Sequence, residues 1–171
     1  IERRNAIHMG IHLTSSPWVD LLLWINDMYG KDGDDSVWFP SLEEYYEYNY
    51  YRIHSTIRKE IKGNELKLYV TLPSEGDFYY PSITVNLNHL TMQHVKTVSS
   101  GNMVTGLSYG DYADGMMLNI DCRKFLLQHA THFVEQYEED KTNESNKTDA
   151  IYFVNMLKES EQKQQLLDRV K

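Results

Sequence analysis

Residues 35–52 read DSVWFPSLEEYYEYNYYR, and this stretch decides how the chain is expected to fold on either side of it. Ser41 followed by Glu44 matches a capping box, in which each side chain bonds the backbone of the other. We therefore expect a helix that begins at Ser41 and runs to about Ile57 or Glu60. The apolar run Val37-Trp38-Phe39 directly before it predicts a short buried strand over residues 36–39.

The predicted helix carries apolar residues along two faces. Tyr46, Tyr50 and Ile53 fall on one face, and Tyr45, Tyr48 and Arg52 fall on another. A helix of this kind is usually enclosed between two layers, and tyrosine suits such a position because its ring is buried while its hydroxyl reaches a polar partner. We expect the helix to form a seam between the segment before it and the strands after it. The alternative is an exposed aromatic platform for sugar rings.

Working outward, the chain predicts an α+β fold. Pro17 after Ser16 starts a helix over residues 16–29, which Gly30 ends. From Asn64 the pattern changes to period 2, and five short segments separated by turn residues predict a small antiparallel β-sandwich over 61–122. The predicted strands lie at 64–72, 78–87, 93–98, 102–109 and 115–120. Two C-terminal helices follow in 123–171, the first capped by Asp121 and the second by Asp149, with a polar loop over 138–149 between them. Residues 1–60 form the remaining predicted domain.

Charge and cysteine content exclude several classes of protein. The net charge is −8 and no cluster of Lys and Arg occurs, which argues against nucleic acid or an anionic membrane as a partner. The single Cys122 excludes an internal disulfide framework and a cysteine-based zinc site, but it does not indicate a compartment. No apolar run approaches the roughly 18 residues of a membrane span.

His8 and His12 are the most prominent candidate site residues. Their H-x3-H spacing can place both rings on one side of a helix or a strand, which makes a two-histidine metal site one interpretation. Gly10 between them disfavours a helix. The alternation of Ile7, Met9 and Ile11 instead predicts a buried strand with both histidines on its other face.

Residues 8 to about 52 resemble a known family. Ile11-His12 at the end of a strand is followed by an amphipathic helix, the strand VWF at 37–39, and a helix that reads SLEEYYEY. This order resembles the C-terminal end of the NodB-homology domain of polysaccharide deacetylases. The resemblance implies a distorted barrel of parallel strands, a divalent metal that is usually zinc, and hydrolysis of acetyl groups on a polysaccharide. It also implies that His12 is the general acid that protonates the leaving amine.

The family's paired-aspartate motif and its H-[S/T]-x-x-H metal motif do not occur in the chain. The resemblance therefore implies a fold that is the remnant of a deacetylase-like barrel followed by the sandwich and helices. The chain would be the C-terminal region of a longer protein. It would itself be non-catalytic and without a cofactor, the zinc or other divalent metal would lie in the missing N-terminal part, and polysaccharide would be its partner.

Two other functions are compatible with the sequence. The first is a free-standing carbohydrate-binding module. The second is a structural or interaction domain without a small ligand, for which the aromatic residues would be buried. For a binding surface the candidate residues are His8, Trp18, Trp38 and Tyr48.

Overall fold

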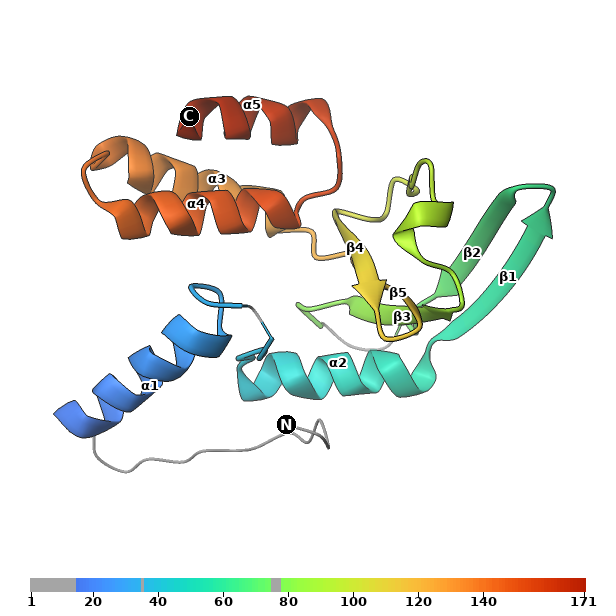
Figure 1. Ribbon diagram of the computed structural model, residues 1–171, viewed down its shortest axis with the longest axis horizontal. Helices are drawn as coiled ribbons and strands as arrows, with labels where there is room; N and C mark the ends of the chain where they lie inside the picture. Colours follow the sequence, from blue (N-terminus) through green and yellow to red (C-terminus); the bar gives the residue numbers. More distant parts are fainter. Residues whose placement is uncertain (1–14, 35, 75–77) are drawn as a thin grey trace. The chain divides into compact units, whose positions relative to one another are not determined.

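The computed structural model describes residues 15–34, 36–74 and 78–171 (Figure 1). The chain divides into two compact units, one up to Phe39 and one from Pro40 to Lys171. The described residues form five α-helices and two small antiparallel sheets, and their strands close no barrel. The predicted α+β class is confirmed, whereas the sandwich and the domain boundaries near residues 60 and 122 stay predictions. No described helix is long and apolar enough to cross a membrane.

The first unit contains α1, Ser16–Tyr29, which has the predicted bounds. Its N-cap is Ser15 rather than Ser16, and Gly30 ends it by donating its N–H to the carbonyl of Asn26 at 2.9 Å. The strand predicted over 36–39 is wrong. The N–H of Val37 donates instead to the carbonyl of Tyr29 at 2.8 Å, so the segment satisfies the C-terminal end of α1 and not a neighbouring strand.

The second unit begins with α2, Leu42–His54. The Ser41 hydroxyl accepts the N–H of Glu44 at 3.0 Å, so the helix starts where its capping box predicts. It ends earlier than predicted, because the β-branched residues Thr56 and Ile57 already belong to strand β1 and pair with β2.

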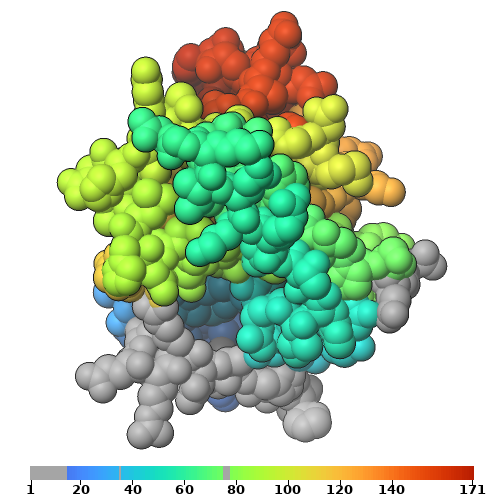
Figure 2. Space-filling view, turned by 90° about the vertical axis from the view of Figure 1, so that its right-hand side faces the viewer, coloured from blue at the N-terminus to red at the C-terminus, as the bar shows by residue number. Residues whose placement is uncertain are grey.

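Strands β1, Thr56–Lys62, and β2, Glu65–Thr71, form a two-stranded hairpin around Gly63, whose φ is +58° (Figures 1 and 2). Figure 2 shows this hairpin in teal on the face toward the viewer. One side of the hairpin is polar, and there the Arg58 guanidinium lies 3.8 Å from the centre of the Tyr69 ring. The other side is mainly apolar and largely exposed, and it consists of the pairs Ile57–Val70, Lys59–Leu68 and Ile61–Leu66.

The second sheet has the strand order β3-β5-β4, with β3 at Ser82–Asn88, β5 at Gly115–Asp121 and β4 at Gly106–Tyr112. Its buried face carries Ile83 and Val85 from β3 and Met116 and Leu118 from β5. Helix α2 packs against β3. The strand predicted over 93–98 is wrong, since the chain there forms a short 3-10 helix, η1, at Met92–His94 and continues as a loop.

Three helices complete the unit, whereas two were predicted: α3 at Leu126–Glu139, α4 at Glu144–Met156 and α5 at Glu161–Val170 (Figure 1). The predicted cap Asp149 lies inside α4. Asp121 does not cap α3, because its carboxylate binds Arg123. Helix α4 begins inside the predicted loop, where the Asn143 side chain accepts the N–H of Ser145 at 3.0 Å. The main core lies among these helices and consists of Leu126, Ala130, Val134, Tyr137, Ala150, Val154, Leu157, Leu166 and Val170.

Candidate functional site

The structure divides the predicted site residues among different parts of the chain. His8 and His12 lie outside the described residues. Trp18 on α1 and Trp38 after it belong to the first unit, and both are substantially exposed. Tyr48 is half-buried on α2, in the second unit. Their assignment as binding residues stays a prediction.

Helix α2 turns an acidic face, not only an aromatic one, toward the interior. Glu44, Glu47, Tyr48 and Tyr51 follow one another at helical spacing, and Glu47 and Tyr51 are buried. Glu47 is 2% exposed, and its two carboxylate oxygens accept the backbone N–H groups of Tyr79 at 3.1 Å and Tyr80 at 2.6 Å. The carboxylate therefore anchors α2 to the chain just before β3.

This geometry corrects part of the expected seam. Tyr45 and Arg52 are exposed rather than turned toward the strands, whereas Tyr48 is half-buried as expected. The sequence did not reveal this inward face, because its two faces were assigned from the apolar side chains and Arg52 and not from the glutamates. The spacing of Glu47, three residues after Glu44 and four before Tyr51, was the signal that could have placed it on the buried face.

A second contact ties the start of α2 to the end of β5. The Arg123 guanidinium binds Asp121, with Nε 2.7 Å and Nη2 2.5 Å from the Oδ2 atom, and its Nη1 lies 3.5 Å from the Oε1 atom of Glu44. Burial raises the pKa of Glu44, while the charge of Arg123 opposes that shift. Burial and the Asp121 carboxylate likewise raise the pKa of the Cys122 thiol beside them.

Aromatic rings gather around Phe78, a residue that the sequence did not single out. The rings of Tyr46, Tyr50 and Tyr51 meet it edge-on at centroid distances of 6.2, 5.1 and 5.7 Å. Tyr46 is 64% exposed, so part of this cluster faces water. Edge-to-face packing of this kind stabilises the helix–loop contact, but the rings do not lie parallel to Phe78 as in a flat sugar platform.

Helix α3 carries the pair His129 and His132. The His129 ring packs edge-on against Phe133 and Phe153 at 5.0 and 4.7 Å, and those two phenyl rings are stacked at 4.2 Å. Burial, followed by the charges of Arg123 and His132, lowers the pKa of His129. This is the packing role expected of a histidine on a helix face.

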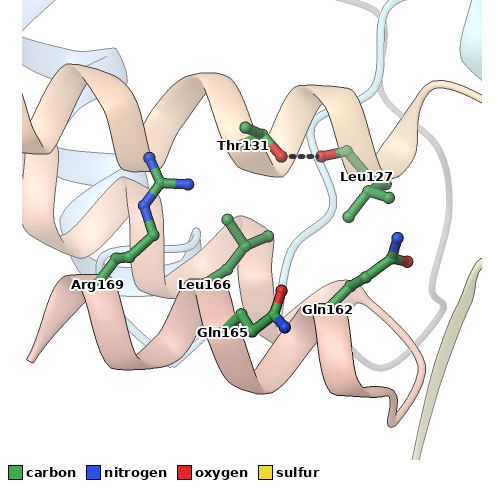
Figure 3. A pocket seen from close by; sticks show the side chains of 6 residues that line it. All are labelled: Leu127, Thr131, Gln162, Gln165, Leu166 and Arg169. Atoms are coloured by element: carbon green, nitrogen blue, oxygen red, sulfur yellow. Dashed lines mark hydrogen bonds between the residues drawn. The ribbon is translucent and has the colours of Figure 1, made fainter.

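A groove lies between α3 and α5 (Figure 3). The Thr131 hydroxyl donates to the carbonyl of Leu127 at 2.8 Å, and the Arg169 guanidinium binds both carboxylate oxygens of Glu138 at 3.0 and 2.7 Å. The Thr131 hydroxyl therefore bonds within α3, and the Arg169 guanidinium already bonds across from α5 to α3. The lining residues are Leu127, Thr131, Gln162, Gln165, Leu166 and Arg169.

The described residues do not fit a zinc centre. Catalytic zinc requires about three protein ligands, and residues 15–34, 36–74 and 78–171 contain no group of three or more His, Cys, Asp or Glu side chains placed to hold a metal.

Comparison with protein families places the chain in a class. A family model described as "Putative polysaccharide deacetylase" matches residues 1–171. The chain belongs to this family, and the resemblance inferred from its sequence is confirmed. It is a deacetylase-like, carbohydrate-related protein. Comparison with curated proteins gives no match.

Proposed function

We propose that this chain is the C-terminal region of a longer deacetylase-like protein, that it is non-catalytic by itself, and that it acts in carbohydrate metabolism by holding polysaccharide. The observation that carries the proposal is membership of the deacetylase family along the whole of residues 1–171. The bonding of the buried acids supports it, because Glu47 is held by two backbone N–H groups and Asp121 by Arg123. Carboxylates used in this way stabilise the fold.

The catalytic chemistry would then belong to a part of the protein that precedes Ile1. That part would supply the paired aspartates and hold zinc or another divalent metal. Within this chain His12 would be the family's late histidine and would donate a proton to the leaving amine. No other residue of the chain is assigned a catalytic role.

Two assays of the purified 171-residue chain test the proposal. Released acetate is measured with an N-acetylated chitin oligosaccharide and added Zn²⁺, and we expect none above the protein-free blank. Co-sedimentation with insoluble chitin and with cellulose tests polysaccharide binding, which we expect for at least one of them. Metal-dependent acetate release that His12→Ala abolishes would overturn the non-catalytic role.

One observation favours a second function, an interaction domain. The outward face of α2 exposes Leu42, Tyr46 and Ile53, which are 68%, 64% and 64% accessible. Apolar side chains aligned on one exposed helix face are typical of protein–protein contact surfaces. If this function holds, the chain fails to sediment with polysaccharide, and Tyr46→Glu with Ile53→Glu abolishes an association seen by size-exclusion chromatography.

A further inference from the structure

The sheet β3-β5-β4 has an outer face whose chemistry differs from the rest of the chain. Side chains alternate along each strand, so the residues between the buried apolar positions share the opposite face. The strand register arranges them in three rows across β3, β5 and β4. The rows are Thr84–Asn119–Ser108, Asn86–Met117–Gly110 and Asn88–Gly115–Tyr112.

These nine positions carry no charged side chain, although charged residues make up 25% of the chain. A fourth row at the end of the sheet contains Asp121, but that carboxylate binds Arg123. Asn86, Asn119 and Ser108 are exposed, so amide and hydroxyl groups dominate what this face presents to water. An uncharged surface of this kind complements a neutral ligand and offers no ionic attraction to a charged one.

The central row is held in place by hydrogen bonds between its side chains. The Thr84 hydroxyl donates to Oδ1 of Asn119 at 2.9 Å, and Nδ2 of Asn119 donates to the Ser108 hydroxyl at 3.2 Å. Each bond uses one donor or one acceptor of the amide. An amide has two of each, so Asn119 keeps a fixed orientation and retains hydrogen-bonding capacity toward a ligand.

The next row leaves room for that ligand. A Cβ atom at Gly110 would meet nothing within 4 Å, and Gly110 pairs directly with Met117, whose side chain is half-buried. The missing side chain leaves an apolar thioether open beside the amides of Asn86 and Asn119. Sugar rings present a C–H face and a rim of hydroxyl or acetamido groups, and this arrangement offers a counterpart to each.

We propose that this outer face of the β3-β5-β4 sheet binds a neutral polysaccharide through its hydroxyl and acetamido groups. The inference rests on the proposed function and names the surface that binds the polysaccharide. Met117 contacts the C–H face of one sugar, and Asn86, Asn119 and Ser108 bond its polar rim. None of the residues of this face is among the predicted candidates Trp18, Trp38 and Tyr48.

Two matched glycine variants test the proposal. Gly110→Glu places bulk and charge on the face, whereas Gly101→Glu places the same side chain in a loop. A Cβ meets nothing within 4 Å at either position, and neither glycine has a positive φ, so both variants should fold and carry the same net charge. Far-UV circular dichroism and melting confirm folding before binding is measured.

Binding is measured by affinity electrophoresis in gels containing neutral glycol chitin, neutral hydroxyethyl cellulose or anionic carboxymethyl cellulose. We expect a neutral polymer to retard the parent chain and Gly101→Glu, and Gly110→Glu to bind about tenfold more weakly or not at all. Equal retardation of both glycine variants would overturn the assignment of this face while leaving the proposed function standing. Retardation by the anionic polymer alone would overturn the inference that the ligand is neutral. If no polymer retards the parent chain, both the assignment of this face and the proposed polysaccharide binding are overturned.

Discussion

Glu47 shows how one side chain can connect distant parts of the chain. It is almost completely buried, and it accepts two N–H groups from Tyr79 and Tyr80, more than thirty positions further along the sequence. A buried carboxylate is tolerated only when its lone pairs are satisfied, and two backbone donors meet that condition. The position of α2 beside β3 therefore depends on a polar contact as well as on aromatic packing.

We predict that Glu47→Ala destabilises the chain by roughly 2–4 kcal/mol, because both backbone N–H groups lose their acceptor in a buried place. Urea unfolding followed by circular dichroism measures the change. Glu43→Ala, at an exposed position in the first turn of α2, is the control and should change the free energy of unfolding by less than about 0.5 kcal/mol. Equal effects of the two variants would contradict the anchoring role.

His129 gives the stability of the chain a dependence on pH. Burial lowers its pKa below the ordinary 6.5, so the unfolded chain binds the proton more tightly than the folded one. The contribution of the neutral ring to stability is present above about pH 6.5 and is lost as the pH falls through the folded pKa. The raised pKa of Glu44 acts in the opposite direction, since its contribution is lost as the pH rises through the folded value.

We expect His129→Phe to flatten the decline in stability as the pH falls below about 6.5, because the variant removes the titrating ring and keeps the aromatic contacts. Unfolding free energies at several pH values provide the measurement. Glu44 is present in parent and variant, so its effect cancels in the comparison. His132→Phe is the matched control, and an identical flattening there would show that His129 is not responsible.

At the scale of elements, Lys163 joins two helices. It is 7% exposed, and its ammonium group donates to the carbonyls of Asn155 and Leu157 at 3.3 and 2.9 Å and to the Glu159 carboxylate at 2.7 Å. The last carbonyls of a helix have no partner inside it, so a cation near them is favourable. Lys163 therefore fixes the turn from α4 into α5.

We predict that Lys163→Met costs roughly 2–3 kcal/mol, because methionine replaces the buried stem but leaves the two carbonyls without a donor. Thermal or urea unfolding measures the loss. Lys124→Met changes an exposed lysine near the start of α3 and should leave stability within about 0.5 kcal/mol of the parent. If Lys163→Met leaves the stability unchanged, water satisfies these carbonyls in place of the lysine.

Local signals predicted the helices better than the connections between them. Helix α1 has its predicted bounds, and α2 begins at its capping box, because both signals act within one turn of the chain. The polar sequence from Glu144 to Asp149 was predicted as loop but forms the first turns of α4, since polarity there reflects exposure and not irregular backbone. The apolar run at Val37 did not indicate its backbone partner, because the N–H of Val37 donates to the carbonyl of Tyr29, eight positions earlier at the end of α1.

The candidate site was predictable only in part. Family membership followed from the order of motifs between His12 and Tyr48, and it is confirmed. The contact of Glu47 with Tyr79 and Tyr80 and the alignment of Asn86, Asn119 and Ser108 depend on strand pairing across many residues. A one-residue change of register would move each strand's side chains to the other face, so no local pattern could specify these rows.

At the scale of the whole second unit, Gly106 marks the contact between sheet and helices. A Cβ there would lie 2.6 Å from the carbonyl oxygen of Met156 and 2.7 Å from Cδ2 of Leu126. Gly106 also forms a bridge with Leu157 just after α4, so β4 and the helical core meet at this position. Only a residue without a side chain allows so close an approach.

We predict that Gly106→Ala destabilises the second unit by roughly 1–3 kcal/mol through overpacking. Gly101→Ala, in open space, should be neutral or slightly stabilising. Far-UV circular dichroism is the suitable measurement, because all three tryptophans precede Pro40 and their fluorescence reports on the first unit. Unchanged melting of Gly106→Ala would show that the helices can shift away from the sheet without loss.

The hairpin of β1 and β2 also bears on how the chain behaves at high concentration. Its mainly apolar side and its two edges, which pair with no other strand of the described residues, are the features that allow strands from different molecules to stack into insoluble aggregates. Lys59 lies in the middle of that side, between Ile57 and Ile61, where its charge acts as a gatekeeper. Lys59→Val should therefore leave the fold intact but increase light scattering in concentrated solution, and Lys62→Val on the polar side should increase it less.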